Sequence, residues 1–349
     1  GNKGSLSVTG SYTGGCVGFV DVAATDLILD GCYNIGNISV PGGRAVGGIV
    51  GFVLGENGGH VTIRNCMNMG KVEGDAIIGG IVGGANSAGN TAGITVTGCW
   101  NAGTVSVSPD NSNVGSMIGM YLGSADDIRD CMVDENYNYG TNGNSLVVKS
   151  EILGTWGAAW WLNGGSFKQS TDLSWTYDKD SAYPVLSATG LSSAESWEQV
   201  GEALEYGLLK DMETPAGDGN TDPYQIQTAE QLAWFAYQVN HVEGMSGTQA
   251  VLTADIDMKE AESKYKSAGR LKWEPIGKRG TAGYTGSFTS SNPADPTDTH
   301  KIYQIQNLYV KTDGPAGLFG VVAGGNISRI GLSNAVVTGG NAGGIAGET

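Results

Sequence analysis

Residues 31–38 read Gly-Cys-Tyr-Asn-Ile-Gly-Asn-Ile, and the pattern returns at 65–72 as Asn-Cys-Met-Asn-Met-Gly-Lys-Val and at 98–105 as Gly-Cys-Trp-Asn-Ala-Gly-Thr-Val. The shared pattern is Cys-x-Asn-x-Gly-x-Val/Ile. Its cysteines recur every 32 to 34 residues, counting Cys131, which opens a degenerate copy. Self-similarity at such a period is the signature of stacked structural repeats.

A second glycine-rich module accompanies each copy, at 14–18, 47–51, 79–83 and 115–119. Between the modules apolar residues alternate with polar ones, as in Val61 and Ile63, which predicts strands and no helices. We expect three short strands in each repeat. One repeat cannot bury its own inner face, so the repeats must stack. The predicted fold class is therefore all-β: a right-handed parallel β-helix (β-solenoid) with short α-helical caps and one connecting helix.

Stacking places equivalent residues of successive repeats one strand spacing apart, about 4.8 Å. Two structural ladders are expected, one of buried, unpaired thiols and one of side-chain amides at a tight turn that tolerates left-handed backbone. Parallel side chains in register hold the wrong dihedral angle for disulfides. The predicted ladder residues are Cys32, Cys66, Cys99, Cys131, Asn34, Asn68 and Asn101.

The Gly-Gly-Ile-Val-Gly modules and the Cys-x-Asn-x-Gly-x-Val segments resemble the GLUG-motif repeats of large bacterial cell-surface proteins, including adhesins of gut bacteria. Later segments resemble the part that opens such arrays. They lie at 224–226, 228–236, 252–258, 273–277, 284–288, 316–320 and 343–347. The resemblance implies an extracellular protein that is attached to the cell surface.

Three regions are expected: repeats with a C-terminal cap over 1–190, a helix and linker over 191–223, and a cap helix with a second array over 224–349. The first cap is predicted as a helix over 150–163, together with Trp175 and the segment Tyr183-Pro184-Val185-Leu186, which resembles the terminal strand of such arrays; the tryptophans are expected to form a lid on the last repeat. Three- and four-residue spacing of apolar positions predicts an amphipathic helix over 193–212. Residues 215–223 are interpreted as a linker, and Thr228 with Gln231 as the capping box of the next helix.

The chain has 349 residues, 58 of them glycine, and a formal charge of −16. The glycines are not part of a three-residue repeat that contains proline, which excludes a collagen-like protein. The negative charge disfavours nucleic-acid partners and anionic lipid surfaces. No segment is apolar for 18 residues, so direct membrane insertion is not expected.

Enzymatic interpretations fit the residues poorly. Fragments of a pectin-hydrolase signature occur at Asp126-Asp127, 220–222 and 270–272, but in the wrong chain order. His60, His241 and His300 stand apart, without ligands at metal-binding spacing. The loop around Asp295, Asp298 and His300 is interpreted as a solvated connection, with a calcium site as the alternative. We predict no catalytic residues, no cofactor and no metal.

The resulting hypothesis is a non-enzymatic, extracellular β-solenoid used in adhesion or as a surface-display spacer. Its partner would be a host or bacterial surface protein or glycan, reached through many weak contacts. The alternative is a carbohydrate-binding or polysaccharide-processing β-helix protein. Its candidate ligand surface is Tyr121, Tyr137 and Tyr139.

The arrangement of the two arrays has three possible forms. The segment 2–8 aligns with 101–107, so residue 1 enters in mid-repeat, and the chain stops after the module at 343–347. Uncapped repeats favour edge pairing. The second array is therefore expected to stack in front of the first, to stack head-to-tail on another molecule, or to remain separate.

Overall fold

The computed structural model describes residues 1–22, 25–55, 59–87, 93–107, 113–166, 173–188, 193–278, 280, 283–292, 295 and 300–349. The chain divides into two compact units, Gly1–Ser192 and Ser193–Thr349. Strands dominate both units, and among the described strands every ladder except one hairpin is parallel. The predicted mostly-β fold with parallel sheets is confirmed.

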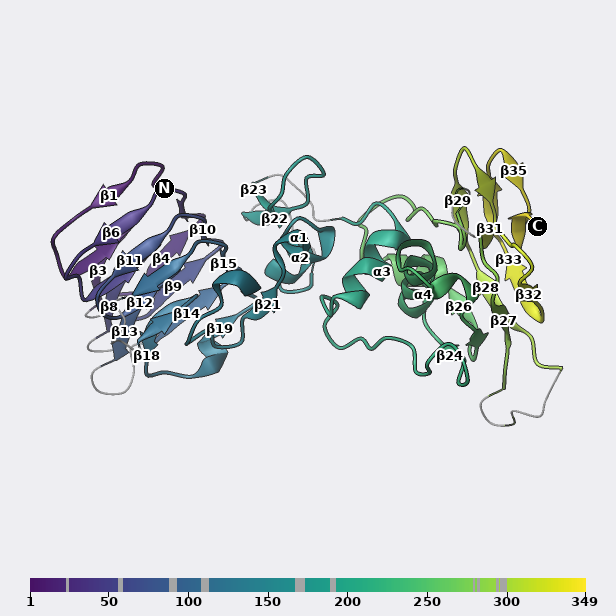
Figure 1. Ribbon diagram of the computed structural model, residues 1–349, viewed down its shortest axis with the longest axis horizontal. Helices are drawn as coiled ribbons and strands as arrows, with labels where there is room; N and C mark the ends of the chain where they lie inside the picture. The colour runs from purple at the N-terminus through teal and green to yellow at the C-terminus, as the bar shows by residue number, and fades with distance from the viewer. Residues whose placement is uncertain are drawn as a thin grey trace. The chain divides into compact units, whose positions relative to one another are not determined.

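The described part of the first unit holds five parallel sheets, and each full repeat contributes one strand to each sheet. In Figure 1 these strands lie in successive tiers. The sheets, in the order that the chain visits them, are β2 (Tyr12–Gly14), β7 (Ala45–Gly47), β12 (Ile78–Gly79) and β17 (Val114–Gly115); β3 (Val17–Val22), β8 (Val50–Gly55), β13 (Val82–Ser87) and β18 (Ile118–Tyr121); β4 (Leu27–Asp30), β9 (Val61–Arg64), β14 (Ile94–Thr97) and β19 (Ile128–Arg129); β5 (Tyr33–Asn34), β10 (Met67–Asn68), β15 (Trp100–Asn101), β20 (Met132–Asp134) and β21 (Leu146–Val148); and β1 (Leu6–Ser7), β6 (Ile38–Val40), β11 (Val72–Gly74) and β16 (Val105–Val107).

Five strands in a full repeat is a correction, because the spacing predicted three. The two glycine motifs each divide one expected strand into two: Gly48 and Ile49 separate β7 from β8, and the segment 69–71, which includes Gly70, separates β10 from β11. The register between repeats is nevertheless the expected one, since Asn68 pairs with Asn34 on one side and with Asn101 on the other.

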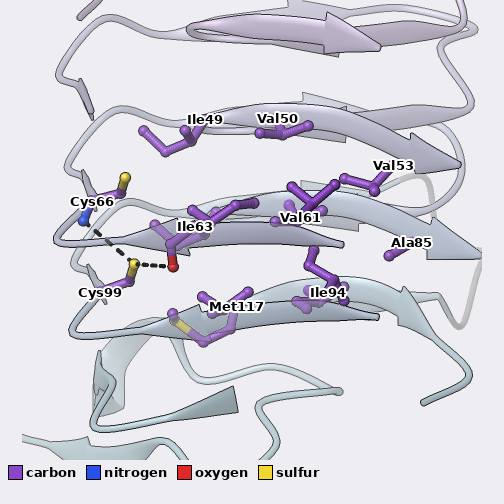
Figure 2. Close-up of a cluster of buried hydrophobic side chains, with 14 of the residues drawn as sticks. Ile49, Val50, Val53, Val61, Ile63, Cys66, Ala85, Ile94, Cys99 and Met117 are labelled. Carbon is purple, nitrogen blue, oxygen red and sulfur yellow. Dashed lines mark hydrogen bonds between the residues drawn. The ribbon is translucent and has the colours of Figure 1, made fainter. Parts of the chain in front are cut away.

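The core of the first unit is a column of branched aliphatic side chains that alternate along each strand. Figure 2 shows Ile49 and Val50 from one wall of this cluster, facing Val61 and Ile63 from another. All four are fully buried. Stacking, which gives each repeat neighbours above and below, is therefore what removes the apolar face of each repeat from water.

The cap of the first unit consists of α1 (Ser150–Leu153), α2 (Trp156–Leu162) and an antiparallel hairpin of β22 (Ser174–Thr176) and β23 (Val185–Ser187). The single helix predicted over 150–163 is thus wrong. It is interrupted because Thr155 takes an extended conformation and its side chain accepts a hydrogen bond from Ala158 N, which begins a new helix. Two short 3₁₀ turns, η1 (Ala125–Asp127) and η2 (Glu135–Tyr137), precede the cap.

The second unit repeats the parallel arrangement. Its helices are α3 (Trp197–Glu205), α4 (Ala229–His241) and α5 (Met258–Glu262), with the 3₁₀ turn η3 (Met245–Gly247). Its sheets are β24 (Tyr224–Ile226), β25 (Ala250–Leu252), β27 (Ser287–Ser290) and β32 (Asn326–Ile327); β26 (Ile256–Asp257), β28 (Tyr303–Gln306) and β33 (Ile330–Ser333); and the pairs β29 (Tyr309–Lys311) with β34 (Val336–Thr338), β30 (Pro315–Ala316) with β35 (Asn341–Ala342), and β31 (Phe319–Val321) with β36 (Ala346–Glu348).

The helix predicted over 193–212 is shorter than expected. α3 ends at Glu205 because Gly207 takes a left-handed conformation, with φ of 67°. Gly207 N then donates to Leu204 O, and Leu208 N donates to Ala203 O, which closes the helix. The helix start predicted at Thr228 is confirmed, since its side chain accepts from Gln231 N at 3.2 Å.

The segment 215–223, predicted as a linker, is an ordered turn of the second unit. Asp218 Oδ1 accepts hydrogen bonds from Asn220 N at 2.7 Å and from Asp222 N at 2.9 Å. Ala216 forms an antiparallel bridge to Gln225 at the start of β24. The Asp218 carboxylate thus satisfies backbone N–H groups within the turn, as aspartate commonly does in turns.

Candidate functional site

The three repeat asparagines form a continuous amide column in the core of the first unit. Asn34 Nδ2 donates to Asn68 Oδ1 at 2.7 Å, and Asn68 Nδ2 donates to Asn101 Oδ1 at 2.8 Å. Asn2 extends the column by donating to Asn34 Oδ1 at 2.7 Å. Each of the three repeat asparagines also donates to the carbonyl of the glycine two residues later. The column therefore satisfies backbone groups as well as itself.

The left-handed backbone conformation lies elsewhere than expected. Asn34, Asn68 and Asn101 are strand residues, whereas the positive φ angles stand three residues earlier, at Gly31 (67°), Asn65 (54°) and Gly98 (58°). Asp130 continues this turn column with φ of 56°. Glycine, asparagine and aspartate are the residues that accept this conformation at low cost.

The repeat cysteines are unpaired, and their burial is graded. Cys66, Cys99 and Cys131 are buried, whereas Cys32, expected to be buried, is only half-buried, as is Cys16. Figure 2 shows Cys66 and Cys99 on neighbouring repeats, where Cys66 N donates to Cys99 Sγ at 3.4 Å. Burial and neighbouring thiols raise the pKa of Cys99 well above its ordinary value. A protonated, enclosed thiol suits packing better than nucleophilic chemistry.

The hairpin part of the cap, which carries Trp175, lies against the side of the repeats, so for this part the expectation of a lid on the last repeat is wrong. Trp175 Nε1 donates to Gly98 O at 2.7 Å, and Asn65 Nδ2 donates to Leu173 O at 3.3 Å. A Cβ on Gly31 would lie 2.7 Å from a methyl carbon of Leu173. The hairpin segment therefore covers the left-handed turn column of three successive repeats.

An apolar pocket of about 310 Å³ lies between this hairpin segment and the β5-β10-β15 sheet. Its floor includes Tyr33, Met67 and Trp100, which occupy equivalent positions of three repeats. Its opposite wall includes Tyr183, whose ring stacks on Trp100 with 5.1 Å between the ring centroids. Sequence reasoning missed this pocket, because it depends on a contact between residues more than 70 positions apart.

The predicted ligand surface does not form one aromatic platform. Tyr121 packs partly against the core, and its hydroxyl donates to the Asp127 carboxylate. Burial and Asp127 raise the pKa of this hydroxyl above its ordinary range. Tyr137 O accepts a hydrogen bond from the Ser116 hydroxyl, and Tyr139 N donates to the same hydroxyl at 2.7 Å. Only the Tyr139 side chain of the three is exposed.

An exposed aromatic cluster instead occupies the outer face of β2, β3 and β8. Tyr12 and Phe19 are 51% and 42% exposed, and their ring centroids lie 5.0 Å apart. Phe52 lies opposite Phe19 in register, with the two rings parallel within 3° and their centroids 6.2 Å apart. The sequence signal was weak because these three residues come from different strands and have no counterpart in later repeats.

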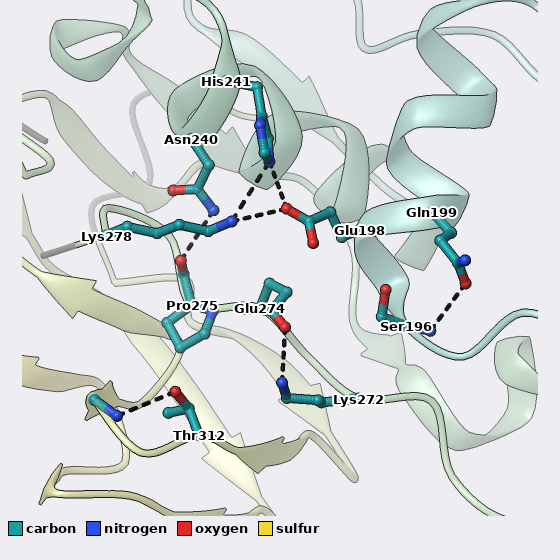
Figure 3. A network of polar contacts seen from close by, with 11 residues as sticks. Ser196, Glu198, Gln199, Asn240, His241, Lys272, Glu274, Pro275, Lys278 and Thr312 are labelled. Atoms are coloured by element: carbon teal, nitrogen blue, oxygen red, sulfur yellow. Dashed lines mark hydrogen bonds and ion pairs between the residues drawn. The ribbon is translucent and has the colours of Figure 1, made fainter. Parts of the chain in front are cut away.

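The second unit carries a polar network between its helices and its strands (Figure 3). Lys278 Nζ donates to Glu198 Oε1 at 2.8 Å, and His241 contacts the same carboxylate. Beside them, Asn240 Nδ2 donates to Pro275 O at 3.1 Å and its Oδ1 accepts from Gly277 N at 2.9 Å. The network fastens α3 and α4 to the segment 275–278. A groove of about 220 Å³ adjoins it, lined partly by Lys278 and Thr312.

The remaining predicted residues are placed apart from one another. His60 Nε2 lies 2.9 Å from Thr95 Oγ1, and His241 belongs to the network above. Asp298 lies outside the described residues, while Asp295 and His300 are described. Within the described part of the chain no three His, Cys, Asp or Glu side chains are grouped as metal ligands. The same residues include no helix of sufficient length and hydropathy to cross a membrane.

Asp126 and Asp127, the acidic pair of the pectin-hydrolase fragment, cap a 3₁₀ turn. Asp127 Oδ2 accepts from Ser124 N at 3.1 Å, and Asp126 Oδ1 accepts from Asn144 Nδ2 at 2.9 Å. The Asp127 carboxylate is thus used within the turn, and the Asp126 carboxylate connects the turn to Asn144, 18 residues further along the chain. Such bonds explain an acidic pair at a turn without catalytic chemistry.

Comparison of the chain with protein-family models, with curated proteins and with solved structures finds no significant match.

Proposed function

We propose that the repeats of the first unit close into a right-handed parallel β-helix that acts outside the cell, attached to the cell surface, as an adhesion module or a surface-display spacer. The observation that carries this proposal is the register. Each repeat visits the sheets in the same order, and each strand pairs in parallel with its counterpart in the next repeat. One full turn of the chain per repeat satisfies this pairing, and right-handed crossovers are strongly preferred between parallel strands.

The internal amide and thiol columns support a mechanical role. The hydrogen bonds from Asn34 to Asn68 and from Asn68 to Asn101 run from one repeat to the next, along the stacking direction. The buried thiols pack along the same direction. A stack of this kind holds its outer face rigid, so that repeated weak contacts to a surface protein or glycan add by multivalency. The acidic composition keeps such a face soluble and selects against nucleic acid.

The adhesion proposal is tested by immobilising the protein and measuring its binding to a glycan array and to a panel of host and bacterial surface proteins. Saturable binding to one class supports adhesion. Binding to neither class, together with full folding, removes adhesion and leaves the spacer role. Cleavage of plant or host polysaccharides by the wild type, abolished in the double variant Asp126→Asn/Asp127→Asn, would contradict the non-enzymatic assignment.

The alternative function, carbohydrate binding, is favoured by one specific observation. Tyr12, Phe19 and Phe52 present neighbouring rings on the outer faces of two parallel sheets, and the two phenylalanine rings are parallel. Aromatic faces at a strand spacing offer stacking surfaces for the apolar faces of sugar rings. We expect Phe19→Ala to abolish glycan binding, whereas Ile28→Ala, at an exposed apolar position on β4, preserves it.

A further inference from the structure

The pocket beside the hairpin has the dimensions of a small-molecule site. Its volume of about 310 Å³ falls at the lower end of the range for ligand pockets. Every lining residue belongs to the first unit. The lining residues are Gly31, Cys32, Tyr33, Asn65, Met67, Met69, Trp100, Trp175, Ser181, Tyr183, Pro184, Val185 and Leu186.

The chemistry of this lining selects against charge. None of the lining residues is Asp, Glu, Lys, Arg or His, so an ionised ligand would lose hydration without gaining a counter-charge. Rings and thioethers dominate the surface, through Trp100, Tyr183 and Met67. Indole, phenol and thioether groups make favourable contacts with aromatic rings. The pocket therefore matches an uncharged molecule with an aromatic ring.

Two buried side-chain polar atoms of the lining residues have no hydrogen-bond partner within the protein. Trp100 is fully buried, and its Nε1–H makes no hydrogen bond. The neighbouring Trp175, in edge contact with Trp100, donates its Nε1–H to Gly98 O. Asn65 donates through Nδ2 to Asp30 Oδ1 at 2.8 Å, but its Oδ1 accepts nothing. Buried groups without partners are rare and costly, so each calls for an explanation.

We propose that this pocket binds a small, uncharged aromatic molecule that also carries a hydrogen-bond acceptor, which pairs with Trp100 Nε1. Trp100 Nε1 and Asn65 Oδ1 are shielded from water in this structure, so binding requires side-chain rotation in the lining. The unbranched side chains of Met67 and Met69 are suited to such movement. The proposal does not depend on adhesion, since it concerns a site on the side wall of the repeats.

The test uses the full chain and a neutral fluorescent probe, N-phenyl-1-naphthylamine, displaced by three ring compounds of similar size. Acetophenone has a carbonyl acceptor, ethylbenzene lacks it, and benzoate is charged. We expect saturable binding of the probe at one site. Acetophenone should displace it at a concentration about threefold to tenfold below that of ethylbenzene, the gain expected from one hydrogen bond. Benzoate should be at least about tenfold weaker than acetophenone.

Two variants locate the site. Met69→Glu places a carboxylate in the lining and should weaken probe binding at least about tenfold. Ile35→Glu is its matched control, because Ile35 holds the same position in the preceding repeat, is similarly exposed (42% against 38%) and does not line the pocket. Trp100→Phe should abolish the advantage of acetophenone over ethylbenzene while leaving ethylbenzene displacement in place.

Three results would overturn the proposal. They are the absence of saturable probe binding to the folded wild type, equal weakening by Met69→Glu and Ile35→Glu, and equal displacement by acetophenone, ethylbenzene and benzoate. If Trp100→Phe does not fold, the comparison of Met69→Glu with Ile35→Glu still decides the location. The glycan and surface-protein assays are unaffected by any of these outcomes, so the two proposals fail separately.

Discussion

Asn68 Nδ2 donates to Asn101 Oδ1 of the next repeat at 2.8 Å and also to Gly70 O of its own repeat at 2.9 Å. One amide thus connects two repeats and closes the turn within one of them. Both partners are buried, so water cannot replace either bond. The column is therefore a stabilising element whose loss should be measurable.

We predict that Asn68→Ala lowers the free energy of unfolding by about 2 to 4 kcal/mol, because it leaves Gly70 O and part of the neighbouring amides without partners. Urea denaturation followed by circular dichroism measures the change. Asn2→Ala is the control, since Asn2 lies at the partly exposed end of the column. A cost for Asn68→Ala no larger than that for Asn2→Ala would contradict the stabilising role of the column.

The glycine motif and the asparagine motif depend on each other. A Cβ on Gly48 would lie 2.6 Å from Asn68 Cγ, and a Cβ on Gly80 would lie 2.5 Å from Asn101 Cγ. In the last repeat the amide column ends, with Val133 paired to Asn101, and Ser116 stands in place of the glycine. The glycine is thus required where the amide is present.

From this relationship we predict that Gly80→Ala destabilises the protein by about 3 kcal/mol or more, through overlap with Asn101 and with the Ser116 carbonyl. Ser116→Ala tests the same position of the next repeat, where Cβ is already accommodated, and should cost less, about 1 to 2 kcal/mol, because it removes only the hydroxyl that bonds to Tyr137 O and Tyr139 N. Thermal unfolding of both variants provides the measurement. If Gly80→Ala unfolds at the wild-type temperature, the proposed interdependence is incorrect.

The five cysteines should react slowly with alkylating reagents, and the half-buried ones should react faster than the buried ones. Cys16 and Cys32 are half-buried, and Cys66, Cys99 and Cys131 are buried. Hydrogen bonding to Cys32 and burial raise the pKa of Cys16, which slows alkylation even at the accessible end. We predict five titratable thiols in urea without reductant, at most two of which react readily in the native state. Fast native labelling of all five, or fewer than five thiols in urea, would contradict this description.

Cys66→Ser should destabilise the protein by about 1 to 3 kcal/mol, because a hydroxyl replaces a thiol inside an apolar stack. The neighbouring Arg64 O, which accepts from Cys66 Sγ at 3.1 Å, limits this cost by offering the hydroxyl an acceptor. Urea denaturation measures the loss. Cys32→Ser, at the half-buried position, is the matched control and should cost less.

The sequence predicted the repeats and the parallel register because one residue pattern determined both: Asn34, Asn68 and Asn101 align in sequence and in space. It did not predict five strands in a full repeat, because glycine turns divide stretches in which apolar and polar residues alternate without a break. It misplaced the left-handed turn, because asparagine suits both a turn and an amide column. The side pocket depends on the long-range contact of Trp175 with Gly98, which no local spacing encodes.

Trp175 and Trp100 are in contact, and they allow a direct comparison of an indole N–H that has a hydrogen-bond partner with one that has none. Trp175→Phe removes the hydrogen bond to Gly98 O and leaves that buried carbonyl with one partner fewer, at a cost of about 1 to 3 kcal/mol. Trp100→Phe removes a donor that has no partner, so only the packing loss remains. We predict the larger loss in urea denaturation for Trp175→Phe. A larger loss for Trp100→Phe would indicate that its N–H is satisfied in solution.

The Glu198 carboxylate of α3 contacts His241 of α4 and so joins the two longer helices of the second unit. Burial by itself would raise the pKa of Glu198, but Lys278 and His241 outweigh burial and hold the pKa below its ordinary value of 4.5. A carboxyl group with a lowered folded-state pKa contributes stability above its unfolded-state pKa. That contribution is lost as the pH falls through the folded-state value.

Glu198→Gln should therefore reduce stability by about 1 kcal/mol at neutral pH, the upper range for a partly exposed ion pair. As the pH falls from neutral through the lowered folded-state pKa of Glu198, its carboxyl group becomes protonated, and the variant and the wild type should approach each other in stability. Urea midpoints measured across this pH range test the convergence. Glu243→Gln, at an exposed carboxylate just beyond α4, is the control and should follow the wild type throughout. A deficit of Glu198→Gln that persisted unchanged in acid would show that side-chain shape, and not the charge on Glu198, holds α3 against α4.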